Sequence, residues 1–260
     1  MVYRFTRERQ DYSDFASGRV LYSFPGRTAF PVRLASEIFQ RCLEFRTRQG
    51  GTGAGVLYDP CCGSAALLCT LAYLHWDTLD QVIGSDIDAE ALLLARRNLS
   101  LLTLKGMDER IAGIEEMLSR YQKASHRHAL ASATLLRDRL EELTSTHNVT
   151  TRLFSADALQ GADILKQLGD LKVDTVLTDI PYGSSSSWQF SGASRASFSN
   201  PAWHLLQSLL PVLSSCSVVA IVAQKQQKIA HEEYTRVGHF QVGQRKVVFL
   251  VPARMSLERG

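Results

Sequence analysis

The sequence predicts an α/β protein with a doubly wound, seven-stranded, mostly parallel sheet, an antiparallel pair of strands at one edge and an inserted pair of helices. Short buried strands alternate with amphipathic helices along most of the 260 residues. Four strands in succession end in an aspartate. One long stretch rich in Leu, Ala, Arg and Glu interrupts the alternation. We treat residues 1–260 as a single domain.

The first half of the chain supplies the first strands of the sheet. Residues 1–50 form a basic and partly helical segment, and the Gly-rich residues 50–55 precede a strand, which favours a flexible connector over a phosphate-binding loop. Strand, turn, helix and strand then follow in the order of a right-handed crossover with parallel pairing. The expected elements are a helix over 31–46, a strand over 56–58, a helix over 65–74, a strand over 81–85 and a helix over 89–102.

Residues 106–143 contain no proline and are predicted to form two inserted helices. Acidic and basic residues nearly balance there, which favours a packing or substrate-docking appendage over a basic arm. The final two strands are close enough in sequence to pair antiparallel at the sheet edge. The elements expected after the insertion are strands over 150–155, 173–178, 218–223, 237–242 and 246–251, with a helix over 201–213.

The composition limits the classes of protein to which this chain can belong. The first residues are charged and apolar runs such as 217–223 are too short to cross a bilayer, so we expect a cytoplasmic protein with no membrane association. Five cysteines without a CxxC pair, and no histidine at ligand spacing, predict reduced thiols and no metal. The net charge of +3 proves no nucleic-acid partner, although residues 1–50 hold nine arginines against five acids. Such arginines suit phosphate or a solvated surface equally.

Four strand-ending carboxylates are the first candidate site residues. In a doubly wound sheet, ligands bind outside the carboxyl ends of the strands, so these side chains should line one crevice. A single such acid would carry little information, whereas four in succession are informative. They are Asp59, Asp86, Asp157 and Asp179.

The loop after Asp59, with the sequence DPCCGSA, lacks the glycines of a dinucleotide-binding loop, because Ala65 and Leu68 stand at two of the three positions. Asp59 can instead attract an ammonium group, while Gly63 and Ser64 let backbone amides approach a zwitterionic ligand. Cysteines 61 and 62 are interpreted as small buried residues rather than reactive thiols.

The next two acids suit an adenosine group. Asp86 is expected to accept the ribose hydroxyls. Asp88 is a rival two residues on, but it more naturally caps the following helix. Asp157, with Ala158 beside it, would accept the adenine amino group or cap a helix before Ile164, and both alternatives stay open.

The motif DIPYG, residues 179–183, predicts catalysis on a base. An exocyclic amine is a poor nucleophile because its lone pair is delocalised into the ring, so it needs acceptors that hold its hydrogens and orient the nitrogen. Asp179 and the carbonyl of Ile180 supply acceptors, Pro181 stiffens the turn and Tyr182 stacks on the base. Without the preceding strand-ending acids, the same five residues would be interpreted as a turn that follows a strand and has no catalytic role.

Three further residues are candidates for RNA contact. Residues 183–200 are rich in Ser and Gly and are expected to form a flexible substrate loop, in which Trp188 stacks on RNA and Arg195 meets phosphate. A linker with one anchoring aromatic is the alternative. Arg33, at a helix start, is a candidate for a cofactor carboxylate or a phosphate.

The segments DPCCGS, GSDID and DIPYG resemble those of Rossmann-like class I S-adenosylmethionine-dependent methyltransferases, and DIPYG resembles the (D/N)PPY motif of enzymes that methylate amino groups on bases. Together with FPVRLASEIFQRCL, QVIGSDIDAEAL, VLTDIPYG and the helical insertion, most of the chain is similar to the avilamycin-resistance 23S rRNA guanine methyltransferase family, AviRa. Two departures are Ala65, where the family loop usually has Gly, and Ile180, which replaces the first Pro of (D/N)PPY.

The resemblance implies S-adenosylmethionine as cofactor and a guanine of 23S rRNA, naked or in a ribosomal subunit, as substrate, with antibiotic resistance as a consequence and a monomer as the working form. Within the same enzyme class, DNA amino-methylation or glutamine methylation of proteins would use the same motif. A nicotinamide-dependent oxidoreductase is disfavoured by the loop, and a non-catalytic RNA-binding or ribosome-assembly protein is the alternative outside enzymes. The implied cofactor residues are Asp59, Cys62, Gly63, Ser64, Asp86, Ile87, Asp157 and Ala158, and the implied catalytic residues are Asp179, Ile180, Pro181 and Tyr182.

Overall fold

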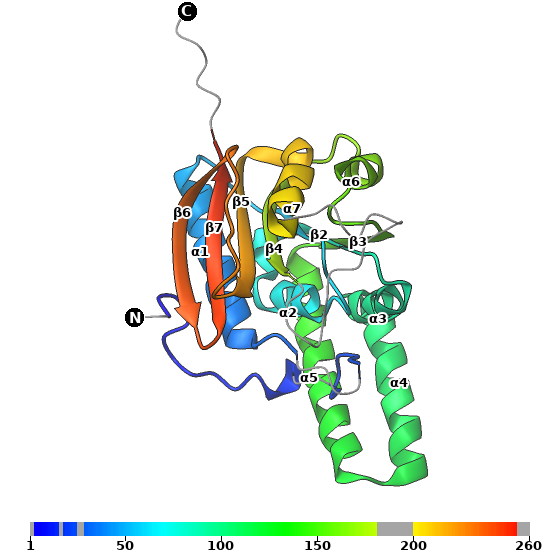
Figure 1. Ribbon diagram of the computed structural model, residues 1–260. Coiled ribbons are helices and arrows are strands. Elements are labelled where there is room, and N and C mark those ends of the chain that lie inside the picture. The colour runs from blue at the N-terminus through cyan, green and yellow to red at the C-terminus, as the bar shows by residue number, and fades with distance from the viewer. Residues whose placement is uncertain (1–2, 16–17, 25–28, 181–199, 254–260) are drawn as a thin grey trace, which may run out of the picture.

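A computed structural model of the chain describes residues 3–15, 18–24, 29–180 and 200–253. A seven-stranded sheet with the order β3-β2-β1-β4-β5-β7-β6 forms its centre (Figure 1). All expected strands are confirmed, with bounds that agree within three residues except that β5 begins five residues before its predicted start. The strands are β1 (Gly55–Asp59), β2 (Leu79–Asp86), β3 (Thr150–Ser155), β4 (Val173–Asp179), β5 (Leu213–Gln224), β6 (Tyr234–Val242) and β7 (Arg245–Pro252).

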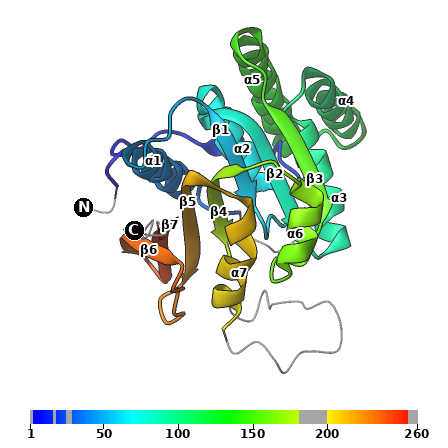
Figure 2. The same ribbon diagram turned by 90° about the horizontal axis from the view of Figure 1, so that it is seen from above.

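Helices cover both faces of this sheet (Figure 2). Successive residues of β1 point to opposite faces, so Leu57 packs in the core with α1, α2 and α3, whereas Tyr58 packs in the core with α6 and α7. This arrangement explains why the central strands are apolar on both sides. The helices of the two layers are α1 (Val32–Arg48), α2 (Ala66–Leu74), α3 (Ala89–Ser100), α6 (Gly161–Leu168) and α7 (Pro201–Leu209).

The strand order reverses at β1, with β2 on one side and β4 on the other. All three strands are parallel. Asp59 pairs with Gly84, two residues before the end of β2 at Asp86. On the other side, Tyr58 pairs with Val176, which also leaves β1 two residues short of the end of β4. The central strand therefore ends before both neighbours at the carboxyl edge, at the point where doubly wound sheets bind ligands, and we call this position at the end of β1 the recess.

The predicted edge pair and insertion are both confirmed. Strand β7 lies antiparallel between β5 and β6. Helices α4 (Leu104–Tyr121) and α5 (Ala124–Thr146) form a hairpin that projects from the body (Figure 1). Apolar residues repeat every three or four positions on the inner side of α5, where Ala129, Ala133, Leu136 and Leu140 are buried.

One helix is shorter than the sequence predicts. The helix expected over 201–213 ends at Leu209 and continues as a 3-10 turn over Leu210–Val212. Pro211 has no amide hydrogen to donate, so the regular helical bonding cannot continue through it. No helix in the described ranges combines the length and apolarity needed to cross a bilayer.

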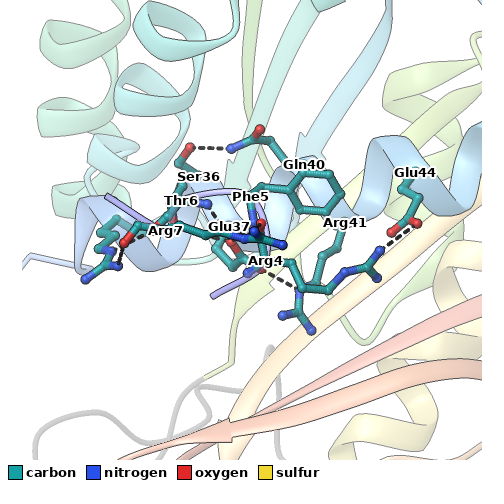
Figure 3. Close-up of polar contacts among 10 residues, drawn as sticks. Arg4, Phe5, Thr6, Arg7, Ser36, Glu37, Gln40, Arg41 and Glu44 are labelled. Atoms are coloured by element: carbon teal, nitrogen blue, oxygen red, sulfur yellow. Dashed lines mark hydrogen bonds and ion pairs between the residues drawn. The ribbon is translucent and has the colours of Figure 1, made fainter. Parts of the chain in front are cut away.

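The N-terminal segment lies along α1, held by one buried carboxylate (Figure 3). Glu37 accepts hydrogen bonds from the backbone amides of Arg4, Phe5 and Thr6 at 2.7, 2.8 and 2.9 Å. The Nε of Arg41 donates to the same carboxylate at 2.8 Å. These contacts fix the segment to the helix that runs back toward the start of β1.

Candidate active site

The loop between β1 and α2 is held against the end of β2. The amide of Cys62 donates to the carbonyl of Ser85 at 2.9 Å, and the amide of Gly63 donates to Oδ2 of Asp86 at 2.8 Å. Gly63 and Ala65 both have left-handed backbone conformations, with φ of 54° and 56°. The loop therefore curls over the recess, although Ala65 takes a conformation that glycine adopts at lower cost.

Asp59 lies at the bottom of the recess and is only 2% exposed. Its Oδ1 accepts the amide of Cys61 at 3.0 Å. Burial raises the pKa of Asp59 to about 7, and the nearby negative charges of Asp86 and Asp179 add to this, while Thr178 and Cys61 oppose it only in part. The recess thus brings three of the predicted carboxylates within electrostatic reach of each other and favours a cation.

Asp86 and Asp88 have different partners, and the predicted capping role of Asp88 is confirmed. Asp88 caps α3, since its side chain accepts the amides of Glu90 and Ala91 at 2.9 and 3.3 Å. Asp86 accepts the amides of Gly63 and Asp88 on its two oxygens, and burial raises its pKa. Each of those oxygens keeps a second lone pair, which can accept a hydroxyl of a ribose.

Asp157 shapes the turn between β3 and α6. Its Oδ1 accepts the amide of Leu159 at 3.0 Å, and both Asp157 and Ala158 are buried. Gln160 occupies the N-cap position of α6, so of the two alternatives for Asp157 the helix cap is wrong, and the adenine contact stays a prediction. The short Asp side chain instead bonds two residues along its own chain, as in an Asx turn.

Asp179 ends β4 beside the recess, on the opposite side from Asp86. The next residue still belongs to the sheet, because the amide of Ile180 donates to the carbonyl of Val222 at 3.1 Å. The Ile180 side chain is 1% exposed and packs in the core with α6 and α7. This burial explains why an aliphatic residue is tolerated at that motif position. Pro181, Tyr182, Trp188 and Arg195 lie outside the described residues.

Arg33 has a different environment from the one predicted. Its Nε donates to the carbonyl of Thr6 at 2.9 Å, and its Nη2 donates to the carbonyl of Arg7 at 2.8 Å. The guanidinium also lies 4.0 Å from the ring centroid of Tyr3. These contacts give Arg33 a structural role in holding the N-terminal segment, and they do not support binding of a phosphate or a cofactor carboxylate.

Asn98 is a site residue that the sequence reading missed. Its Nδ2 donates to the carbonyls of Ser64 and Tyr22 at 2.8 and 2.9 Å, while its Oδ1 accepts the amide of Tyr22 at 2.8 Å. The side chain is fully buried in α3. It therefore ties the loop above the recess to the N-terminal segment. In the sequence, this role could have been inferred from the position of Asn98, a side-chain amide on the apolar face of the predicted helix over 89–102.

Within the described ranges, no group of three or more His, Cys, Asp or Glu side chains is arranged to hold a metal ion. The cysteines have no disulfide partners there, and burial raises the pKa of Cys61 and Cys62 well above the usual value. Cys62 is buried as predicted, whereas Cys61 is half-buried and packs at the edge of the core with α6 and α7.

The strand order, the recess at its reversal point and the acidic strand ends define a class I methyltransferase fold. At the level of fold, the chain matches TrmN from Thermus thermophilus with a TM-score of 0.50 and 18% identity, over 87% of this chain and 50% of that one.

The chain belongs to the AviRa rRNA methyltransferase family, whose model matches residues 1–245. It is 39% identical over 259 residues to the 23S rRNA (guanine(2535)-N(1))-methyltransferase of Streptomyces viridochromogenes, covering 100% of this chain and 99% of the relative. The solved structure of rRNA methyltransferase AviRa from that organism matches with a TM-score of 0.83 and 38% identity, over 97% of both chains. The predicted family and fold are confirmed.

Proposed function

We propose that this protein transfers a methyl group from S-adenosylmethionine to N1 of a guanine in 23S rRNA. The observation that carries the proposal is the recess at the end of β1, where Asp59 is buried between the charges of Asp86 and Asp179. The full-length similarity to an enzyme named for this reaction supports the choice of base and atom.

The residues of the recess suit the proposed cofactor. Asp59 is a buried carboxylate with a pKa near 7, so the ammonium of an amino acid tail would complete its environment. Asp86 would accept the ribose hydroxyls, and the turn at Asp157 and Ala158 would receive the adenine. Backbone amides of the loop over 62–64 can approach the carboxylate of the tail. When bound, the cofactor supplies a methyl group activated by a positively charged sulfonium.

The acceptor atom changes the role expected of Asp179. The motif alone suggests an exocyclic amine, whereas the name of the relative specifies the ring nitrogen N1. In neutral guanine, N1 carries one hydrogen and its lone pair is delocalised, so that proton must leave as the new N–C bond forms. The carboxylate of Asp179 accepts the proton from N1, while the carbonyl of Ile180 accepts a hydrogen from the neighbouring 2-amino group.

This assignment also requires that the target base be accessible to the protein. A guanine inside an RNA helix cannot reach the recess, so the base must leave its stack to lie above Asp179. Stacking on Tyr182 would compensate for the lost base stacking. We further propose that methylation at this base protects the ribosome from an antibiotic that binds there, and that the protein acts in the cytoplasm.

The test uses purified protein, methyl-labelled S-adenosylmethionine and three acceptors: 23S rRNA, duplex DNA and a mixture of cellular proteins. We expect label on rRNA only, and mass spectrometry of the digest should show 1-methylguanosine. Asp179→Asn should lower the turnover number by about a thousandfold, because loss of one transition-state group costs that much in comparable sites. S-adenosylhomocysteine binding by calorimetry should change less than about threefold. Label on DNA or protein alone, or full activity of Asp179→Asn, would contradict the proposal.

A further inference from the structure

The charges of the α4–α5 hairpin are separated along its length. Residues 104–146 contain seven acidic and seven basic residues, so the hairpin is neutral in total. No acidic residue occurs between Glu116 and Asp138, which span the end of α4, the turn and the first half of α5. That interval contains Arg120, Lys123 and Arg127 in addition to Arg137 near its end. The acids therefore lie nearer the body, and we call residues 117–128 the hairpin tip.

The hairpin tip is far from the recess. Helix α4 has 18 residues, which corresponds to a length of about 27 Å. Figure 1 shows the hairpin extending away from the sheet along this whole length. Because charges in solution are screened over roughly 8 Å, the cations of the tip act on what touches the tip.

The side chains at the tip combine exposed cations with an exposed aromatic ring. Tyr121 is 55% exposed, and the Nζ of Lys123 lies 5.8 Å from its ring centroid. Arg120 pairs with Glu116 at 3.1 Å, whereas Lys123 and Arg127 are exposed and form no ion pair with any described residue. Cations beside an aromatic ring are the combination that binds phosphates and stacks on bases.

The helix ends at the tip add a second observation. Helix α5 begins there with no acidic residue in its first turn, and Lys123 at its N-cap makes no side-chain capping bond. Helix stability alone favours Ser, Thr, Asp or Glu at such positions, because they satisfy the amides and the positive end of the helix dipole. Cations at this end lower helix stability, which is the choice expected where the tip meets an external anion.

We propose that the hairpin tip is a second rRNA contact, which binds the phosphate backbone of an RNA element remote from the target guanine. This inference rests on the proposed function, since it takes RNA as the substrate. The tip adds affinity without touching the reacting base. It therefore lowers KM for RNA and leaves the turnover number unchanged.

The experiment compares two triple variants that reverse equal charge in the full-length protein. The test variant is Arg120→Glu, Lys123→Glu and Arg127→Glu. The control variant is Lys105→Glu, Lys166→Glu and Arg236→Glu, three exposed residues outside the tip. Both are assayed on protein-free 23S rRNA at several salt concentrations and, in parallel, on intact ribosomal subunits, with circular dichroism to verify the helix content.

For the test variant we expect KM for rRNA to rise about tenfold or more and the salt slope of binding to fall by about 2 to 3, as for the loss of three phosphate contacts. The turnover number and S-adenosylhomocysteine affinity should stay within about twofold, and the control should change KM by less than about threefold. Equal KM values and salt slopes for the two variants would overturn the inference. So would an effect that appears only on intact ribosomal subunits, because the partner would then be a protein. If wild-type protein methylates no RNA, the proposed function itself fails.

Discussion

Two buried carboxylates, Glu37 in α1 and Asp59 at the end of β1, have pKa values that move in opposite directions. Burial alone would raise the pKa of Glu37, but hydrogen bonds from the amides of Arg4 and Thr6 and from Arg41 outweigh it and lower the pKa. Asp59 has fewer donors and two acidic neighbours, so its pKa rises to about 7. The protein thus supplies enough hydrogen-bond donors to stabilise the charge of Glu37, whereas the donors around Asp59 do not offset its burial.

This difference separates a structural carboxylate from one that fits a ligand. Glu37 fixes the N-terminal segment to α1, and nothing further is required for its charge to be stable (Figure 3). Asp59 lies at the point where the strand order reverses, and no cationic side chain of the described residues forms an ion pair with it, so a bound cation would stabilise its negative charge. The two carboxylates should therefore differ in their effects on stability, on its pH dependence and on ligand affinity.

The largest expected loss of stability is that of Glu37→Ala. Removing this carboxylate leaves three backbone amides and Arg41 without their acceptor, so the free energy of unfolding should fall by about 3 kcal/mol or more. Because the pKa of Glu37 is lowered on folding, its contribution is present above pH 4.5 and is lost as the pH falls through the folded value.

Urea unfolding at pH 7 measures this effect. Glu44→Ala in the same helix is the matched control, since Glu44 forms ion pairs with the exposed Arg4 and Arg48. Its loss should cost less than about 1 kcal/mol. Similar costs for the two variants would contradict the structural role of Glu37.

Asp59→Asn should have the opposite effect on the stability of the ligand-free protein. Since the folded pKa of about 7 exceeds the usual 3.8, the folded state holds a proton that the unfolded state releases, and wild-type stability falls as pH rises between these values. The amide variant removes this dependence. At pH 8 it should be more stable than the wild type by up to about 4 kcal/mol, as the shift in pKa implies.

The same variant should bind S-adenosylhomocysteine more weakly at pH 8, because the ammonium loses its partner. At pH 6, wild-type binding should release a proton from Asp59 and the variant should release none. Calorimetry in two buffers of different ionisation enthalpy measures this release. Proton release by both proteins would assign the effect to another group.

Asp86→Ala should weaken S-adenosylhomocysteine binding about 10- to 100-fold, since hydrogen bonds to a charged group contribute about 1.5 to 3 kcal/mol. The variant loses both the proposed ribose acceptor and the contact that holds the amide of Gly63. Asp88→Ala removes the cap of α3 and should cost about 1 kcal/mol in stability, with affinity changed by less than about threefold. An equal loss of affinity in the two variants would refute the separate roles.

Local patterns account for what the sequence could predict. Strand ends, the DPCCGS turn and the capping role of Asp88 depend on residues close in the chain, so the recess and its acids followed from the sequence alone. Glu37 and Asn98 were missed because their backbone partners lie 31 to 33 and 34 to 76 residues away.

Two other features could not be read from the sequence for a different physical reason. The contacts of Arg33 with the N-terminal segment were not predicted, because a guanidinium binds backbone carbonyls through the same donors that bind phosphate. The near balance of charge over 106–143 concealed the basic hairpin tip, because a chain that folds back on itself places its two acidic ends together. Total charge cannot report such a separation, whereas the position of each residue along the hairpin can.

The smallest expected effects on stability are those of substitutions at two residues with left-handed backbone conformations. They are Ala65 above the recess and Gln122 at the hairpin tip, with φ of 56° and 48°. Gln122→Gly should raise the free energy of unfolding by about 1 kcal/mol, because glycine adopts this helix-ending conformation without strain. Ala65→Gly relieves the same strain but removes a fully buried methyl group, worth about 0.8 kcal/mol, so its net effect should be near zero. Urea unfolding of each single variant and of the double variant measures both, and the effects should add because the sites are distant. If Ala65→Gly stabilises the protein as much as Gln122→Gly does, the methyl group of Ala65 contributes nothing to packing. Alanine at this position would then only destabilise the fold, through its strained backbone conformation.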